Sequence, residues 1–425
     1  MWVTLLSSVW LTFCAIAAAR GATWYVDDSV SSPGNGESWD AAFKTIQEGI
    51  DAASDGDTVV VAEGTYVENI VFSGKNIVLC SQDRLNADTV KNTIIDGNES
   101  GPVVKFAGTE DDTCLLAGFT IQGGKADEGG GICGGYEGAG THATIINNII
   151  IRNSATVGGA GLFRCDGVIR NNTITENSAR YDGGGLCMCA GTIQNNAITA
   201  NSAGHGSGGG LYDCFGTIEN NTVTGNSASS GGGLYGCDAV ILNCIIWGNT
   251  ASRVDPQLCS SRTPSYSCVE GWTEGGEGNT AEDPKFADAD GPDDIPDTYE
   301  DNDYRLSDGS PCIDTGKNED WMDGAVDLDG NPRILFGVSS ATVDMGAYEY
   351  NPFQFKITQV SKVAGDGAHL TWTSRPGDTY TIWSSTDLTA PTWAEEATLA
   401  SQGTSTSWTD PPSAAPCTFY RIQLK

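Results

Sequence analysis

The densest group of possible metal ligands is an acidic run in the last third of the sequence. Asp288 and Asp290 precede a Gly-Pro step, which Asp293 and Asp294 follow. Oxygen ligands spaced two residues apart around a glycine turn suit calcium, which takes six to eight such contacts. The spacing differs from an EF-hand loop, because no bidentate glutamate stands at the twelfth position. The run predicts a calcium site, and a solvated acidic loop without metal is the alternative.

Side chains suited to acid–base catalysis are few. Hydrolysis of a glycosidic bond needs an acid and a base carboxylate, whereas Gly204-His205-Gly206 supplies only a histidine, which we interpret as a loop residue. The charged residues of the central region occupy outward or turn positions without an obvious cluster, and we interpret them as a solvated surface: Arg152, Arg164, Asp166, Arg170, Glu176, Arg180, Asp182, Asp213, Glu219 and Asp238. The sequence therefore leaves catalytic residues unidentified.

These side chains belong to a short segment that is written five times between Gly129 and Arg253, with a degenerate earlier copy from Gly118. Each copy contains a glycine cluster, an aliphatic residue, a cysteine, an aliphatic-x-Asn-Asn step, which becomes Asn243-Cys244 in the fifth copy, and a closing asparagine. The spacing is 23 to 25 residues, apart from a longer first unit. The asparagine pairs begin at Asn147, Asn171, Asn195 and Asn220. A period of this length without a 3.6-residue stripe predicts coils of three short strands.

Successive coils of this kind would pair as parallel sheets about 4.8 Å apart, so that like residues stack and the aliphatic columns form a continuous core. Glycine and asparagine suit the corners because both tolerate left-handed backbone. With these columns, the chain from Thr23 to Asn249 resembles the right-handed parallel β-helix proteins of the pectin-lyase-like superfamily. The resemblance implies an all-β solenoid. It leaves the activity open, because that fold hosts lyases, hydrolases, esterases, adhesins and phage tailspikes.

Four of the 14 cysteines hold one repeat position, three residues after the leucine column: Cys165, Cys189, Cys214 and Cys237. Stacking would bring their Cα atoms to about 5 Å, inside the range that a disulfide needs. Cross-rung disulfides and a ladder of buried thiols are both compatible with this pattern. Cys133 and Cys187 share a second column.

The beginning of the chain predicts export. Residues 1–22 contain an apolar stretch that ends in three alanines, typical of a secretory signal peptide; lipidation at Cys14 is the alternative. The apolar stripe of Phe43, Ile46 and Ile50 predicts a helix that ends at Gly56 and caps the open end of the β-helix. Irregular first strands are expected at 58–62, 69–72, 76–80, 93–96 and 103–106.

After Arg253 the repeat fails. Cys259 and Cys268 stand in a loop that a disulfide between them could staple. Residues 283–350, with DLDGNPR and VDMGAYEY, resemble the closing segment of bacterial choice-of-anchor proteins, which implies that the β-helix domain spans 23–350. Alternating runs in 353–425 predict a small β-sandwich, which resembles a fibronectin-type-III-like module. We interpret most of its tryptophans as core residues, with sugar stacking as the alternative.

The formal net charge of −33 argues against nucleic acid and anionic membrane surfaces as partners. No apolar run of the mature chain is long enough to span a bilayer. We therefore expect a monomeric, secreted or surface-attached protein that binds a polysaccharide or cell-surface glycan without catalysis, with calcium as its one possible cofactor. The alternative is a polysaccharide lyase, in which a Lys or Arg base removes the proton. Clustered Lys, Arg and carboxylates along one sheet would favour the lyase, and a smooth Thr/Ser/Asn face would favour binding.

Overall fold

The computed structural model describes residues 21–135, 140–291, 302–335, 341–351, 357–362, 368–374, 379–385, 393–403, 405–410 and 419–424. The chain divides into two compact units, Met1–Tyr350 and Asn351–Lys425. Residues 1–20 lie outside the described ranges, so the signal peptide and the alternative at Cys14 stand as predictions. Within the described ranges, no helix combines the length and apolar character that a membrane span requires.

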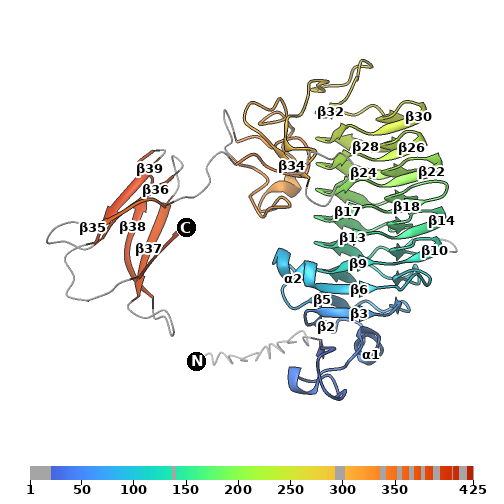
Figure 1. The fold of residues 1–425 in the computed structure, drawn as a ribbon, viewed down its shortest axis with the longest axis horizontal. Coiled ribbons are helices and arrows are strands. Elements are labelled where there is room, and N and C mark those ends of the chain that lie inside the picture. The colour runs from blue at the N-terminus through green and yellow to red at the C-terminus, as the bar shows by residue number, and fades with distance from the viewer. Residues whose placement is uncertain are drawn as a thin grey trace, which may run out of the picture. The chain divides into compact units, whose positions relative to one another are not determined.

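The first unit is a parallel β-solenoid, in which stacked coils form four parallel sheets (Figure 1). This confirms the predicted parallel β-helix. Each regular coil passes through sheets A, B, D and C in that order. Sheet A contains β1 (Thr23–Val26), β2 (Thr58–Val61), β5 (Val78–Ser81), β8 (Leu115–Ala117), β12 (Thr144–Ile146), β16 (Val168–Arg170), β20 (Thr192–Gln194), β24 (Gly216–Glu219) and β28 (Ala239–Leu242). Sheet B contains β3 (Gly64–Val67), β6 (Thr93–Asp96), β9 (Thr120–Gln122), β13 (Ile149–Ile151), β17 (Thr173–Thr175), β21 (Ala197–Thr199), β25 (Thr222–Thr224), β29 (Ile245–Trp247) and β32 (Cys268–Val269).

The other two sheets complete each coil. Sheet D contains β10 (Lys125–Glu128), β14 (Ser154–Gly158), β18 (Ser178–Ala179), β22 (Ser202–Ser207), β26 (Ser227–Ser230) and β30 (Thr250–Val254). Sheet C contains β4 (Ile70–Val71), β7 (Val104–Lys105), β11 (Ile132–Cys133), β15 (Leu162–Phe163), β19 (Leu186–Cys187), β23 (Leu211–Tyr212), β27 (Leu234–Tyr235) and β31 (Leu258–Cys259).

The prediction of three strands per coil is wrong, because a regular coil has four. The fourth corner separates sheet D from sheet C and is made by the glycine cluster itself. Gly159 has a φ of 63°, and Gly183, Gly208 and Gly231 repeat that left-handed conformation at 63°, 67° and 58°. Glycine adopts it without a Cβ clash, so the cluster turns the chain instead of extending a strand.

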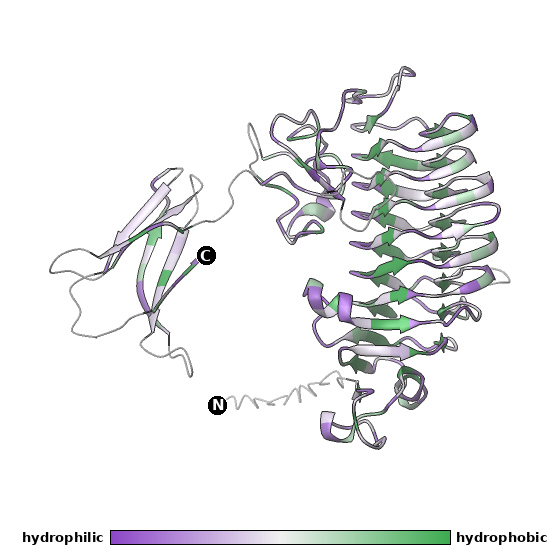
Figure 2. Cartoon of the chain, viewed as in Figure 1, coloured by the Kyte–Doolittle hydropathy of each residue, from purple (hydrophilic) through white to green (hydrophobic). Residues whose placement is uncertain are grey.

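The aliphatic columns stack in register as predicted. The Ile145 column of sheet A and the Ile150 column of sheet B align from rung to rung and are buried in one continuous core. Figure 2 shows hydrophobic strands repeating along the solenoid. Because each rung covers the apolar face of the next, the coils stabilise one another instead of folding around a separate core.

Two columns of asparagine run inside the solenoid. The second member of each Asn pair and the closing asparagine of each unit are buried, and their side chains bond to neighbouring rungs. Asn196 is typical: its Oδ1 accepts from the main-chain N–H and the Nδ2 of Asn172, at 2.9 and 3.0 Å. Its own Nδ2 donates to the Ile169 carbonyl at 2.9 Å and to Asn221 Oδ1 at 3.0 Å. The ladders satisfy main-chain groups that the corners would otherwise leave unpaired.

Two short helices flank the first coils. Helix α1 (Ile46–Ala52) follows the one-turn helix η1 (Trp39–Ala41), and its Thr45 cap and Glu48 form a capping box. Ile46 and Ile50 join the solenoid core, as expected of a cap, but the helix ends before Gly56 because Ala53 is already extended. Helix α2 (Ala87–Asn92) was not predicted from the sequence, although Asn86 caps it through the N–H groups of Asp88 and Thr89.

The remaining elements lie after the last coil. Strands β33 (Phe286–Asp288) and β34 (Asp303–Leu306) pair antiparallel, and η2 (Asp320–Met322) follows. The second unit has two antiparallel sheets, β35 (Ile357–Lys362), β36 (Ala368–Thr373) and β39 (Ser405–Thr409), and β38 (Ala394–Ala400), β37 (Thr379–Ser385) and β40 (Phe419–Leu424). Trp372 of one sheet contacts Tyr380 of the other, and both are buried. This agrees with the predicted sandwich and with a core role for Trp372.

Candidate functional site

The outward asparagines at the corner between sheets A and B form the candidate site's floor. Asn147, Asn171, Asn195 and Asn220 have φ values of 56°, 57°, 55° and 50°, and Asn243 continues the column at 54°. The predicted corner role of these residues therefore agrees with their backbone. The structure adds that the closing segment, defined here as the described residues of 303–350, covers only part of the column.

Three asparagines of the column hold the main chain of the closing segment. Asn243 donates from Nδ2 to the Lys317 carbonyl at 2.9 Å and accepts the Lys317 N–H on Oδ1 at 2.8 Å. Asn220 Nδ2 donates to the Asp344 carbonyl at 3.1 Å, and Asn195 Nδ2 donates to the Val326 carbonyl at 3.2 Å. The corner amides thus fasten residues more than 70 positions later in the chain.

A buried arginine completes this attachment. The guanidinium of Arg333 lies 3.1 Å from a carboxylate oxygen of Glu349, and both side chains are almost completely excluded from solvent. It also donates to Asn195 Oδ1 at 3.0 Å and to the carbonyls of Asp344 and Gly346 at 3.2 and 3.1 Å. One cation therefore joins the solenoid corner to the closing segment.

Two buried carboxyl groups near Arg333, those of Asp344 and Glu349, have raised pKa values. Burial raises the pKa of Asp344 to about 7, although its carboxylate accepts the N–H groups of Asp314 and Tyr350 and faces Arg333. Burial also raises the pKa of Glu349, against the opposing effect of Arg333. Proton uptake is therefore coupled to docking of the closing segment.

We expect the closing segment to dock less tightly as pH rises. The folded pKa of Asp344 exceeds its unfolded value of about 4, so the folded state binds more protons between these values. The resulting stability is fully present below about pH 4 and is lost as pH rises through about 7. Limited proteolysis should cut the closing segment faster at about pH 8 than at about pH 5. Asp344→Asn should reduce this difference and the exposed Asp323→Asn should preserve it; a wild-type difference of opposite sign would contradict the prediction.

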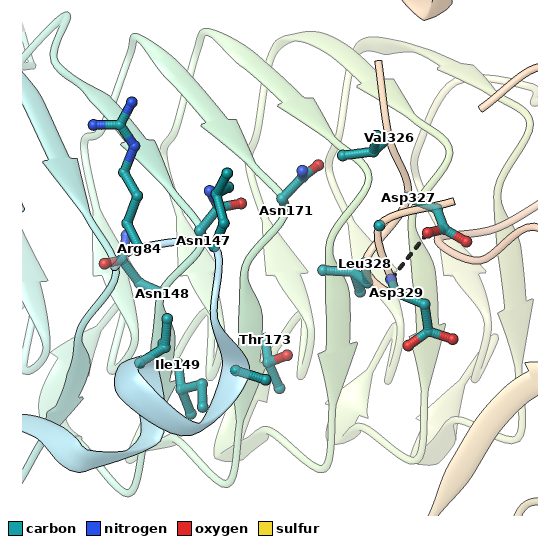
Figure 3. A pocket seen from close by; sticks show the side chains of 14 residues that line it. Arg84, Asn147, Asn148, Ile149, Asn171, Thr173, Val326, Asp327, Leu328 and Asp329 are labelled. Atoms are coloured by element: carbon teal, nitrogen blue, oxygen red, sulfur yellow. Dashed lines mark hydrogen bonds between the residues drawn. The ribbon is translucent and has the colours of Figure 1, made fainter. Parts of the chain in front are cut away.

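A cleft of about 490 Å³ lies over the first two asparagines of the column (Figure 3). Asn147 and Asn171 stand between Arg84 on one side and Asp327 and Asp329 on the other. We call this space the asparagine cleft, and its further lining residues are Leu85, Ala87, Val90, Asn148, Ile149, Thr173, Val326, Leu328 and Gly330. The carboxylate of Asp327 accepts four hydrogen bonds, all from residues of the closing segment.

A second cleft, of about 650 Å³, opens beside the last coils, and we call it the Trp247 cleft. Its aromatic residues are Trp247, Phe286 and Tyr304, and the last two rings meet edge to face at 5.4 Å. The indole N–H of Trp247 has no hydrogen-bond partner among the described residues. The polar lining residues are Thr224, Ser227, Thr250, Asp283, Lys285, Asp290 and Asn302. The cleft therefore combines ring faces with hydroxyl, amide, ammonium and carboxylate groups.

Two ladders of hydroxyl groups lead along the solenoid into this cleft. In sheet B, Thr175, Thr199 and Thr224 align with Trp247, and Thr199 Oγ1 donates to Thr175 Oγ1 at 2.9 Å. In sheet D, the aligned residues are Ser178, Ser202, Ser227 and Thr250, and the first two hydroxyls lie 3.0 Å apart. The sheet B threonines are buried, while the sheet D serines and Thr250 are exposed or half-buried. Together these residues form the hydroxyl face.

Only part of the acidic run lies within the described residues. Asp288 ends β33 and is exposed, and Asp290 is exposed and lines the Trp247 cleft. Asp293 and Asp294 lie outside the described residues, so the calcium site stays a prediction. Within the described ranges, no three His, Cys, Asp or Glu residues are placed to hold a metal ion.

Charged residues of the repeats mostly follow the predicted surface role. Arg152 pairs with Glu176 at 2.9 Å. His205, in β22, has an exposed side chain that lies against the ring of Tyr181. Glu219 is the exception, because its side chain is buried and accepts a hydrogen bond from Gln194 at 2.9 Å. The fold buries it because neighbouring rungs and later segments cover that part of sheet A.

All described cysteines have free thiols. The column of Cys165, Cys189, Cys214 and Cys237 is a buried thiol ladder, and each Sγ contacts the carbonyl two residues earlier at 3.5 to 3.6 Å. The proposed staple between Cys259 and Cys268 does not form, since these residues lie in strands of different sheets. Cys268 instead shares a buried cluster with Cys312.

Several residues of the two clefts escaped sequence analysis. Trp247 occupies the position where earlier repeats have threonine, so its departure from the repeat was the available signal. Arg84 and Leu85 precede the unpredicted helix α2, and no local pattern connects them with Asp329, more than 240 residues later. Only the folded coil brings these segments together.

Comparison with known proteins assigns the chain to no family, because no family model and no curated protein matches it. The solved structures similar to it include the following two. One is described as the crystal structure of pectate lyase Pel9A, with 14% identity and a TM-score of 0.38, covering 77% of this chain and 96% of that one. The other is described as the complex structure of XylC with xylose, with 11% identity and a TM-score of 0.30, covering 94% and 100%. Similarity at this level does not assign an activity.

Proposed function

We propose that this protein is exported and binds a polysaccharide or cell-surface glycan without cleaving it. The observation that carries the proposal is the junction between the hydroxyl face and the Trp247 cleft, at Thr224, Ser227 and Thr250. A sugar ring has an apolar C–H face that stacks on an indole, and its hydroxyls exchange hydrogen bonds with small polar side chains. The cleft offers both kinds of contact.

The repeat of the hydroxyl face supports a polymer as the ligand. Its accessible hydroxyls, those of sheet D, recur once per rung, about every 4.8 Å, so a chain lying along the solenoid meets similar groups repeatedly. This pattern supports binding, because a smooth Thr/Ser/Asn face is the feature that we expected to favour it.

A carbohydrate-active enzyme is the second candidate, because Lys285, Asp283 and Asp290 line the same cleft. A lyase needs a base, and a hydrolase needs paired carboxylates. Lys285 Nζ already donates to the Gly309 carbonyl at 2.7 Å, and Asp283 Oδ1 accepts the Lys285 N–H at 2.8 Å. These bonds tie two of the three charged groups to the surrounding loop, which favours binding.

Replacing Trp247 with alanine should weaken binding about fivefold to thirtyfold, because one stacked ring contributes about 1–2 kcal/mol. Affinity electrophoresis in gels containing neutral and acidic polysaccharides, with calcium or with chelator, measures the dissociation constant. Trp39→Ala is the matched control, because Trp39 is 39% exposed beside the N-terminal cap. If every polysaccharide that slows the wild-type protein slows the two variants equally, the Trp247 cleft is not the binding site.

A further inference from the structure

We infer that the asparagine cleft is a docking site for an extended polypeptide segment. The outward asparagine column shows on three rungs how it binds main chain: Asn195, Asn220 and Asn243 each donate Nδ2 to a carbonyl of the closing segment. Asn243 also accepts the N–H of the same residue that it donates to. The cleft continues this interface onto the two preceding rungs.

The amides of those two rungs retain the capacity to bind. Asn147 has a φ of 56° and Asn171 of 57°, matching 55° at Asn195, so the three backbones present their side chains from the same corner. Asn147 makes no side-chain hydrogen bond to a described residue. Asn171 Oδ1 accepts from Asn195 Nδ2 at 2.8 Å, while its own Nδ2 has no acceptor among the described residues. Each amide can therefore donate to one further carbonyl.

The walls of the cleft suit the side chains of a peptide. Leu85 is 79% exposed and Val326 is 39% exposed, and both line the cleft. Leu328 and Ile149 add further apolar surface. None of the described lining residues is aromatic, which disfavours a sugar here and distinguishes this cleft from the Trp247 cleft.

The charges at the two ends restrict the peptide further. Arg84 stands at one end and Asp329 at the other, as Figure 3 shows. A complementary segment has apolar residues at its centre, an acidic residue toward Arg84 and a basic residue toward Asp329. The carbonyls of its main chain bond to Asn147 and Asn171.

A library of displayed heptapeptides, selected on the full chain, supplies defined probes. The best peptides are then synthesised, and fluorescence anisotropy gives their dissociation constants. Asn147→Gly should weaken binding about fivefold to tenfold, because it removes one hydrogen-bond donor. Leu85→Asp should weaken it about tenfold by removing an apolar wall. Both changes are at tolerant positions, since glycine keeps the left-handed backbone of Asn147 and Leu85 is exposed.

Asn98→Gly is the matched control, because Asn98 has a φ of 48° in an exposed turn outside the cleft. Unchanged affinity for this control, with losses at Asn147 and Leu85, supports the proposal. Equal affinities of the peptides for all variants overturn it. The proposal also fails if selection on the wild-type chain enriches no peptide beyond those that selection on the Asn147→Gly/Leu85→Asp double variant enriches. Binding of N-acetylated chitotetraose in place of any peptide, lost in the same double variant, also overturns it in favour of a sugar site.

Discussion

Replacing Arg333 with methionine should release the closing segment from the solenoid and lower its docking stability by about 3–5 kcal/mol. Arg333 is fully buried, and its guanidinium bridges Asn195 and Glu349. Methionine fills a similar volume but leaves the buried Glu349 carboxylate without its cation and the Gly346 carbonyl without its donor, while the Asp344 carbonyl keeps only Asn220. The unpaired buried charge dominates this cost. Hydrogen exchange with mass spectrometry should show lost protection in 303–350 while the coils at 144–246 stay protected.

The matched control is Arg305→Met. Arg305 also pairs with a carboxylate, that of Asp303 at 2.5 Å, but its side chain is 56% exposed. Exposed pairs contribute at most about 1 kcal/mol, so this variant should keep its protection. Similar exchange in the two variants would show that the buried arginine does not hold the closing segment.

Replacing Asn196 with alanine should destabilise the solenoid by about 3–5 kcal/mol, because several buried polar groups lose their partners together. Asn196 makes four hydrogen bonds, two through Oδ1 and two through Nδ2. Alanine leaves the Asn172 and Ile169 groups buried without replacement. Urea unfolding followed by circular dichroism measures the loss, with a check for two-state behaviour because repeat proteins can open in parts.

The control for this change is Asn147→Gly, at the outward member of the asparagine pair two rungs earlier. Its side chain bonds to no described residue, so the loss should stay within about 0.5 kcal/mol. Equal destabilisation by the two variants would contradict the account, because it would show that the internal ladder contributes no more to stability than an outward side chain at the corner.

The sequence predicts the solenoid because its core repeats. A single aliphatic column fixes the register of every rung, so Ile145 and Ile150 identify two sheets without any tertiary information. Corner geometry was harder to predict. Glycine tolerates both extended and left-handed backbone, so the cluster at Gly159 was compatible with a strand end or with a separate corner.

The two members of each asparagine pair cannot be distinguished from their residue type. Asn147 turns the chain and faces outward, whereas Asn148 points into the ladder, and the difference follows from the φ of the corner. The clefts were also beyond local patterns. The walls of each cleft come from segments far apart in the chain. Leu85 and Val326, for example, line the same cleft only because the coils between them bring their segments together.

The most direct test of glycan binding without cleavage follows both the protein and the polymer. Purified protein is incubated with each polysaccharide that retards it, with calcium or with chelator, and polymer length is measured by size-exclusion chromatography together with ultraviolet absorbance and reducing ends. We predict retention with unchanged polymer length, no new double bond and no new reducing end. Shortened polymer that persists in wild type and disappears in Lys285→Ala, Asp283→Asn or Asp290→Asn would contradict the account and establish an enzyme.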